Sequence, residues 1–181
     1  MNNQTLSKNH LELLIREEII AKRLLDVAEE LNQKFQDRQV VLVSIMKGAV
    51  CLTADLMRLL SFPFALEWIE CKSYGMKGVQ KGTLNIRGLE ELVLENQHVI
   101  LIDDIFDSGE TLFSVYKKIL EKNPASVTSL VLLAKNVPRD MSYFPDFVLF
   151  NIEDRFVVGY GLDYKEQYRG LPGIYAYGPS L

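Results

Sequence analysis

The sequence predicts an α/β protein built on an open, mainly parallel sheet. Short apolar segments rich in Val, Ile and Leu alternate along the 181 residues with segments whose apolar residues recur at helical spacing. Continuous apolar strands are typical of parallel sheets that helices cover on both faces. With 48% hydrophobic and 24% charged residues, the chain has the composition of one compact domain with a real core. We therefore expect residues 1–181 to form a single domain.

The first third of the chain is expected to hold two strands and two helices. Leu11 to Ile15 is a short strand candidate, and Val40 to Met46 has the β-branched composition of a strand buried on both faces. The segment from Ala49 to Leu60 is apolar enough for a buried helix that stops before Pro63. Between the two strands, the apolar residues fall on one helical face: Ile20, Leu24, Val27, Leu31 and Phe35.

In the middle of the chain, a strand candidate is followed by a glycine-rich segment. Residues from Phe64 to Ser73 and Tyr74 have the composition of a strand. Residues 75–83 contain three glycines and two lysines and have no apolar period. Their composition favours an ordinary hairpin connection, and a mobile lid over a site is the alternative.

The clearest pattern is the stretch from Val99 to Leu112, VILIDDIFDSGETL. Apolar β-formers up to Ile102 indicate a buried strand, and Asp107 to Thr111 has the polar, glycine-containing composition of a loop that opens a helix. That helix is expected to stop at Asn123 and Pro124. Its apolar residues recur at i, i+3, i+4, i+7 and i+8: Leu112, Val115, Tyr116, Ile119 and Leu120.

The remainder of the chain is expected to complete the sheet. Val127 to Ala134 is a buried strand candidate, Phe147 to Phe150 and Phe156 to Val158 are shorter ones, and residues 159–181 are expected to be ordered by packing. Ligands of open α/β sheets bind at the carboxyl ends of the strands. This rule places three groups of residues on one rim: Met46-Lys47-Gly48, Asp103-Asp104 and Lys135.

Charge and cysteine usage exclude several classes of protein. A net charge of −4 argues against nucleic acid or an anionic membrane as the main partner, because both require a basic face. Cys51 and Cys71 have neither metal-ligand spacing nor a secreted disulfide pattern, which favours reduced thiols. The N-terminus has no secretory signal pattern, and no apolar run reaches about 18 residues. We therefore expect a cytoplasmic protein.

The loop after the central strand has the parts of an anion site. It offers a glycine, two hydroxyl groups and a run of backbone N–H groups at a helix N-terminus, where the helix dipole favours negative charge. The neighbouring carboxylates are suited to sugar hydroxyls, Mg²⁺ or proton transfer. Neither an EF-hand nor a P-loop has this order of residues. Simple helix capping would account for Asp107 or Ser108 but leaves Asp103 and Asp104 unexplained.

The same stretch resembles the phosphoribosyl pyrophosphate (PRPP) signature of the type I phosphoribosyltransferases, in which an apolar strand leads into two acidic residues and a phosphate loop. Further matches, in the order of the hypoxanthine-guanine phosphoribosyltransferase branch, cover most of the chain from Leu11 to Pro172. They are Met46-Lys47-Gly48, Ser73-Tyr74, Leu133-Ala134-Lys135, Pro145-Asp146-Phe147, Phe156 to Tyr164, and Arg169.

The resemblance implies a fold and an activity. The fold is the single-domain type I phosphoribosyltransferase fold, a twisted and mainly parallel sheet flanked by helices, with a small hood built from terminal segments. The activity is purine salvage: Mg²⁺-dependent transfer of the 5-phosphoribosyl group from PRPP to N9 of hypoxanthine or guanine, which gives IMP or GMP and pyrophosphate. Relatives are dimers or tetramers, which implies a homo-oligomer here.

The resemblance also implies roles for the residues that bind PRPP. Asp103 and Asp104 would bind the ribose hydroxyls, with Mg²⁺ bridging sugar and pyrophosphate, and Asp163 would lie near Mg²⁺ through water. Lys47, Gly48 and Arg169 would contact pyrophosphate, and the family often has a non-proline cis peptide beside the lysine. The 5′-phosphate would be held mostly by backbone N–H groups of Asp107, Ser108, Gly109, Glu110 and Thr111.

At the purine, the resemblance implies that Lys135 donates a hydrogen bond to the 6-oxo group. Phe156 would stack on the base, and backbone groups of Val157 would contact its edge. Asp163 would also belong to the purine site, and Asp107 would be the general base at N7. Ser73, Tyr74 and the glycine-rich loop would close over the site, which favours the lid interpretation of residues 75–83.

Asp103 stands where the family usually has Glu, and its side chain is one methylene shorter. Ser108 for Thr is a mild change, and Glu110 places a charge where relatives often have Lys or an apolar residue. A regulatory PRPP sensor of the same fold is the alternative from another class, although the chain is acidic and keeps Lys135 and Phe156. A phosphoribosyltransferase for xanthine would share every PRPP-binding part.

Overall fold

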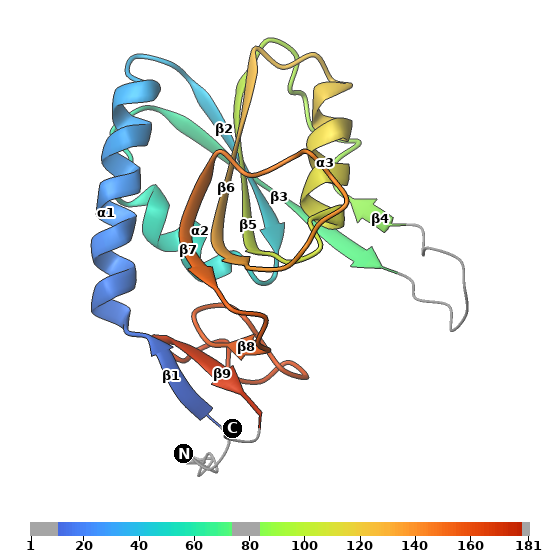
Figure 1. Cartoon of the computed structure of the whole chain (residues 1–181). Coiled ribbons are helices and arrows are strands. Elements are labelled where there is room, and N and C mark those ends of the chain that lie inside the picture. The colour runs from blue at the N-terminus through green and yellow to red at the C-terminus, as the bar shows by residue number, and fades with distance from the viewer. Residues whose placement is uncertain (1–10, 74–83, 179–181) are drawn as a thin grey trace, which may run out of the picture.

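The larger of two sheets forms the body of the protein (Figure 1). The computed structural model describes residues 11–73 and 84–178. Strand order in this sheet is β4-β3-β2-β5-β6-β7, with parallel neighbours except for β4, which is antiparallel to β3. The strands are β2 (Val40–Met46), β3 (Phe64–Ser73), β4 (Leu84–Arg87), β5 (His98–Phe106), β6 (Ser126–Lys135) and β7 (Phe147–Ile152).

Helices cover both faces of this sheet, as its apolar strands predict. Helices α1 (Glu17–Lys34) and α2 (Val50–Met57) pack on one face, and α3 (Glu110–Leu120) packs on the other (Figure 1). Each face has its own cluster of buried apolar side chains. The predicted α/β class with a mainly parallel sheet is therefore confirmed.

A small second sheet lies at the end toward which the parallel strands point (Figure 1). It consists of β1 (Leu11–Ile15), β9 (Ile174–Tyr177) and β8 (Val157–Val158), in that order and antiparallel. Because β1 comes from the N-terminal part of the chain and β8 and β9 from the C-terminal part, this sheet is the predicted hood. Val157 and Ile174 belong to the same buried cluster as α1 and α2, so hood and main sheet share a core.

The apolar face of α1 is confirmed in full. The five residues that define it, from Ile20 to Phe35, are each at most 2% exposed. In α3, Leu112, Val115 and Ile119 are buried as predicted, whereas Leu120 is 45% exposed because the helix ends there. Glu17 and Glu18 lie in the first turn of α1, where carboxylates interact favourably with the helix dipole.

Several boundaries differ from the prediction. Helix α2 ends at Met57 rather than Leu60, because the N–H of Leu59 bonds to the carbonyl of Leu56 in a tighter turn. Strand β5 continues past Ile102 to Phe106, since β6 pairs with it along this whole length. Strand β8 begins after Phe156.

Strands β4 and β9 were not predicted as strands. Each has four residues and is defined by pairing with a partner, β3 for β4 and both β1 and β8 for β9. Both cysteines are free thiols, as expected, and both are half-buried. In the described part of the chain, no helix is long and apolar enough to cross a membrane.

Two neighbouring leucines of α1 test how far its apolar face stabilises the fold. Leu24 is 2% exposed and Leu25 is 55% exposed. We expect Leu24→Ala to lower the free energy of unfolding by about 2 to 5 kcal/mol, because it leaves a cavity in the core. Leu25→Ala is the matched control, with an expected change within about 0.5 kcal/mol. Equal losses in urea unfolding would contradict the assignment of the buried face.

Candidate active site

The carboxyl ends of three neighbouring strands, β2, β5 and β6, bring the predicted rim residues together. Lys47 follows β2, Asp103 and Asp104 lie near the end of β5, and Lys135 is the last residue of β6. The parallel register aligns these ends, since Asp103 pairs with Val131 across β5 and β6. Ser73 ends β3 in the same sheet, whereas Tyr74 and residues 75–83 lie outside the described residues.

Two adjacent carboxylates are held at the centre of this edge. Asp103 is 5% exposed, and its Oδ1 accepts a hydrogen bond from the N–H of Asp104 at 3.0 Å. Asp104 is half-buried and accepts one from the N–H of Ile105 at 2.9 Å. Burial, followed by the charge of Asp104, raises the pKa of Asp103 well above its usual value, and burial also raises the pKa of Asp104. A pair that resists ionisation is suited to a cation or to hydroxyl groups.

The loop after β5 turns into α3 at a glycine. Gly109 is the N-cap of α3 and has φ +82°, a left-handed conformation that glycine adopts without strain. A Cβ at Gly109 would lie 2.7 Å from the Phe106 ring and 2.8 Å from the sulfur of Met141, so a larger side chain does not fit. The cap is therefore neither Asp107 nor Ser108. The Ser108 hydroxyl instead accepts a long bond from the N–H of Glu110 at 3.4 Å.

Lys135 forms ion pairs with two carboxylates from different segments. Its Nζ lies 2.9 Å from Asp107 Oδ2 and 3.0 Å from Asp154 Oδ1. Burial alone would lower the pKa of Lys135, but the hydrogen bonds to Asp107 and Asp154 outweigh it and raise the pKa above its usual value. Lys135 is therefore a cation and a pure hydrogen-bond donor throughout the neutral range.

Arg139, to which no sequence pattern pointed, fixes the loop that carries Asp107. Its guanidinium donates to the carbonyl of Asp107 at 2.7 Å, to that of Phe106 at 2.9 Å and to that of Val137 at 3.4 Å, and also to the carbonyl of Lys135. It also lies 4.5 Å from the Phe106 ring centre. Arg139 thus ties the end of β5 to the end of β6.

The turn after β2 packs closely on the acidic pair. The peptide bond between Met46 and Lys47 is cis, the arrangement that the family often has beside this lysine. A Cβ at Gly48 would lie 1.6 Å from Asp104 Oδ2, so only glycine fits at this position. A Cβ at Gly161 would in turn lie 2.1 Å from the Gly48 carbonyl oxygen. The hood, the β2 turn and the acidic pair are therefore in direct contact.

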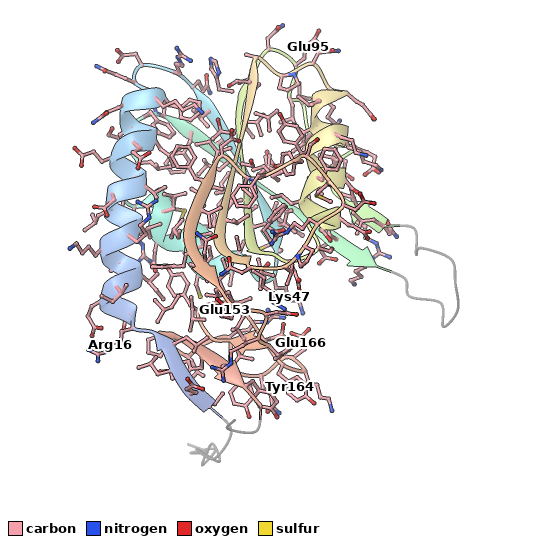
Figure 2. The ribbon with its side chains drawn as sticks, in the orientation of Figure 1. Arg16, Lys47, Glu95, Glu153, Tyr164 and Glu166 are labelled. Carbon is pink, nitrogen blue, oxygen red and sulfur yellow. The ribbon has the colours of Figure 1, made fainter. Side chains whose placement is uncertain are left out.

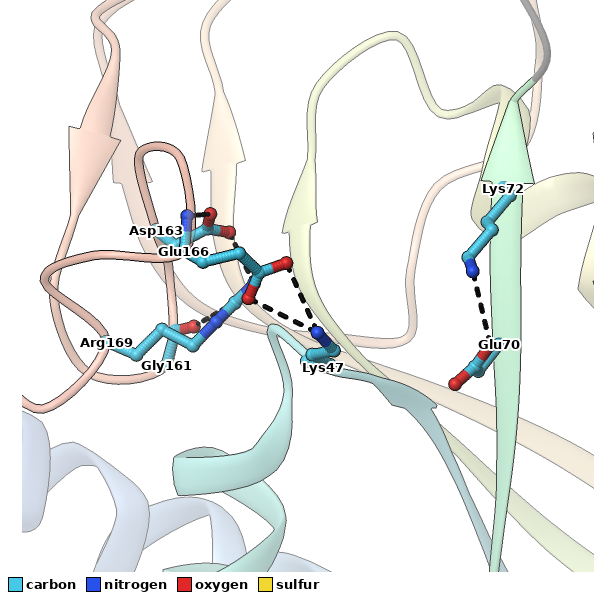
Figure 3. A network of polar contacts seen from close by, with 7 residues as sticks. All are labelled: Lys47, Glu70, Lys72, Gly161, Asp163, Glu166 and Arg169. Atoms are coloured by element: carbon cyan, nitrogen blue, oxygen red, sulfur yellow. Dashed lines mark hydrogen bonds and ion pairs between the residues drawn. The ribbon is translucent and has the colours of Figure 1, made fainter.

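Charged side chains of the hood face Lys47 across this junction (Figures 2 and 3). Arg169 donates to the Gly161 carbonyl at 2.7 Å and pairs with Asp163 at 2.7 Å. Glu166 pairs with Lys47 at 3.2 Å and with Arg169 at 3.3 Å. Hydrogen bonds from Lys47 and then Arg169 lower the pKa of Glu166, so its carboxylate is ionised at neutral pH.

Two of the hood residues predicted at the purine, Phe156 and Val157, differ in exposure. Phe156 is 51% exposed, and its ring meets those of Tyr164 and Tyr177 edge to face. Val157 is 5% exposed and pairs with Ala176 in β9. Phe156 thus presents an aromatic surface to solvent, and Val157 presents backbone in a fixed position.

Comparison with known proteins identifies the family. A family model described as "Phosphoribosyl transferase domain" matches residues 12–165. The chain is 35% identical to hypoxanthine-guanine phosphoribosyltransferase of Aquifex aeolicus (strain VF5), over 91% of this chain and 93% of that protein. The chain belongs to the hypoxanthine-guanine phosphoribosyltransferase family. Its identity to the Bacillus subtilis (strain 168) member is 34%, over 94% of each chain.

Solved structures of the family agree with this assignment. The hypoxanthine phosphoribosyltransferase of Trypanosoma cruzi, in complex with the product IMP, matches with a TM-score of 0.86 and 33% identity, over 95% of this chain and 96% of that chain. The predicted family, the type I phosphoribosyltransferase fold and the predicted class of enzyme are therefore confirmed.

The raised pKa of Asp103 predicts a pH-dependent stability. Because the folded state holds this proton more tightly than the unfolded state, stability falls as pH rises from the unfolded pKa of about 4 toward the raised folded value. Asp103→Asn keeps the shape but removes the titration. Thermal unfolding without Mg²⁺ should therefore show the stability of the variant increasing relative to that of the wild type as the pH rises above about 4. Asp26→Asn, on the exposed face of α1, is the control and should show no such trend.

Removal of the Arg139 guanidinium is expected to destabilise the fold. Arg139→Met keeps much of the aliphatic stem but leaves partly buried carbonyls without a donor, so we expect a loss of about 1 to 3 kcal/mol in urea unfolding. Arg58→Met is the control, because the Arg58 side chain is 73% exposed and lies 3.6 Å from Asp55. If Arg139→Met cost no more than Arg58→Met, Arg139 would not fix the loop.

Proposed function

We propose that this family member transfers the 5-phosphoribosyl group of PRPP to N9 of a 6-oxopurine in purine salvage and releases pyrophosphate. One observation carries the proposal: a helix N-terminus, the Asp103–Asp104 pair and a cationic Lys135 paired with Asp107 meet at one sheet edge. These groups match, in turn, the phosphate, the sugar and the base of a purine nucleotide. The family assignment supports the same reaction.

In this proposal the start of α3 holds the 5′-phosphate. The backbone N–H groups from Asp107 to Thr111 lie at the positive end of an 11-residue helix, which stabilises an anion. Asp103 and Asp104, directly before the loop, accept hydrogen bonds from the ribose 2′- and 3′-hydroxyls. Glu110 contributes through its backbone N–H.

We further propose that Mg²⁺ binds together with PRPP. Among residues 11–73 and 84–178, no group of three or more His, Cys, Asp or Glu side chains is arranged to hold a metal. The Asp103–Asp104 pair fits Mg²⁺ all the same, because Mg²⁺ is commonly held by one or two carboxylates plus substrate phosphates. Asp163 lies at the hood side of the junction and would contact the ion through water. The ion would neutralise charge on the leaving pyrophosphate.

Lys47, Gly48 and Arg169 form the proposed pyrophosphate site. As pyrophosphate departs from ribose C1′, negative charge grows on it, and two fixed cations stabilise that charge. Gly48 brings backbone close to the acidic pair, which no other residue permits. The site thus places leaving-group stabilisation directly beside the sugar.

At the base, Lys135 selects a 6-oxopurine. A lysine ammonium only donates hydrogen bonds, so it accepts a 6-oxo group and rejects the 6-amino group of adenine. Phe156 stacks on the base, backbone groups of Val157 contact its edge, and Asp107 takes the N7 proton so that N9 becomes the better nucleophile. Ser73, the last residue of β3, would help to exclude water from the reactants.

We also propose that residues 1–181 act as one domain within a homo-oligomer, and that PRPP and a 6-oxopurine are its partners rather than nucleic acid or membrane. The shared core of hood and sheet supports the single domain. Leu66 and Trp68 project from the same side of β3 and are 43% and 58% exposed, which supports a subunit contact.

The direct test is to mix the protein, Mg²⁺ and PRPP with hypoxanthine, guanine, xanthine or adenine in turn and follow nucleotide formation. We expect turnover with hypoxanthine, guanine or both. No turnover with any base would overturn the proposed reaction and favour a regulatory PRPP-binding protein. Preference for adenine would contradict the role of Lys135. Exclusive use of xanthine, which is also a 6-oxopurine, would contradict the expected use of hypoxanthine or guanine.

The base role of Asp107 gives a kinetic prediction. Asp107→Asn should lower kcat by about 10² to 10⁴ while changing PRPP affinity far less, because backbone N–H groups hold the phosphate. Asp154→Asn is the matched control, since Asp154 pairs with the same lysine Nζ at 3.0 Å. An unchanged kcat for Asp107→Asn, or an equal loss for Asp154→Asn, would remove Asp107 from the base role.

A further inference from the structure

The Glu166 carboxylate lies between the two cations of the proposed pyrophosphate site. Both its oxygens are 3.2 Å from Lys47 Nζ, and Oε2 is 3.3 Å from a terminal nitrogen of Arg169 (Figure 3). Lys47 comes from the turn after β2, whereas Arg169 and Glu166 come from the hood. A single carboxylate therefore joins the two cations across the boundary between the sheets.

A strained turn directs Glu166 toward these cations. Tyr164 and Gln167 form an antiparallel bridge, and the two residues between them, Lys165 and Glu166, have φ of +51° and +62°. Such two-residue turns favour Asn and Gly, because other side chains are strained at positive φ. The N–H of Glu166 bonds to Asp163 Oδ2 at 2.8 Å, which fixes the turn from its other side.

The carboxylate and a bound pyrophosphate need the same donors. Lys47 has one ammonium group, and Arg169 already directs one nitrogen to Gly161 and another to Asp163. A pyrophosphate brings more negative charge and more acceptor oxygens than one carboxylate, so it takes over these donors when both are present. The Glu166 carboxylate would also repel it at this distance.

We infer that Glu166 is an internal competitor for the pyrophosphate site: it pairs with Lys47 and Arg169 in the free protein and leaves them when PRPP or pyrophosphate binds. This inference rests on the proposed function, because it assumes that these two cations bind pyrophosphate. Glu166 thereby weakens the binding of PRPP and of the product pyrophosphate alike. Nucleotides that lack pyrophosphate, such as IMP, do not compete with it.

The inference predicts a gain of affinity on removing a charged residue. The paired side chains are exposed, 61% for Lys47 and 66% for Glu166, and exposed ion pairs contribute little. We therefore expect Glu166→Gln to tighten binding of PRPP and of magnesium pyrophosphate by about twofold to fivefold. Binding of IMP should stay unchanged. Glu166→Ala should act in the same direction.

The experiment is calorimetric titration of the full chain with PRPP, magnesium pyrophosphate and IMP, without any purine base, so that no turnover is needed. Glu12→Gln is the matched control. Glu12 is also an exposed hood carboxylate paired with an arginine, 2.7 Å from Arg155, and its loss changes the net charge equally. Thermal unfolding of each variant shows that it is folded.

The titrations distinguish failure of the proposed function from failure of the competitor role of Glu166. If the wild type bound neither PRPP nor pyrophosphate, the proposed function and the competitor role would both be overturned. If the wild type bound them but Glu166→Gln bound them equally or more weakly, Glu166 would instead position the cations, and only the competitor role would fail. An equal gain in Glu12→Gln would also overturn it, because net charge alone would then account for the effect.

Discussion

Close backbone contact between hood and main sheet is the constraint on which the site depends. Gly161, at φ +101°, lies against the carbonyl of Gly48, and Gly48 lies against the side chain of Asp104. A Cβ at either glycine would overlap these atoms, so any larger residue would force the two sheets apart. The contact holds Arg169 of the hood beside Lys47 of the sheet. The proposed leaving-group site is therefore built from two sheets rather than from one loop.

Charge is arranged differently in the two halves of the site. At the outer rim, opposite charges pair across segments, as Lys135 does with Asp107 and Lys47 with Glu166. At the centre, the like charges of Asp103 and its neighbour are buried together, which raises the pKa of Asp103. Such a pair costs stability in the free protein and gains from a bound cation. The acidic pair at the centre therefore gains stability when a cation binds. The charges at the rim already have partners in the free protein, and a ligand must displace those partners to bind there.

Local sequence patterns predicted the helices and strands whose formation depends mainly on residues near each other in the chain. The apolar period of α1 and the composition of VILIDDIFDSGETL located a helix and the strand, loop and helix at the site. Strands β4 and β9 were missed, because four residues become a strand only through distant partners. No sequence pattern pointed to Arg139 or Glu166. Arg139 acts on the backbone carbonyls of a distant segment, and Glu166 is directed by a turn, and both arrangements form only when the chain folds. The individual ligand roles came from resemblance to the family.

The most direct test of the account is a crystal structure of the protein with IMP. We predict that the phosphate lies on the N–H groups from Asp107 to Thr111, that the ring of Phe156 stacks on the base, and that Lys135 Nζ donates to the 6-oxo oxygen. Lys135 would then share its donors between the base and its present carboxylate partners. A nucleotide bound away from the carboxyl ends of β5 and β6, or with its 6-oxo group turned away from Lys135, would contradict the account.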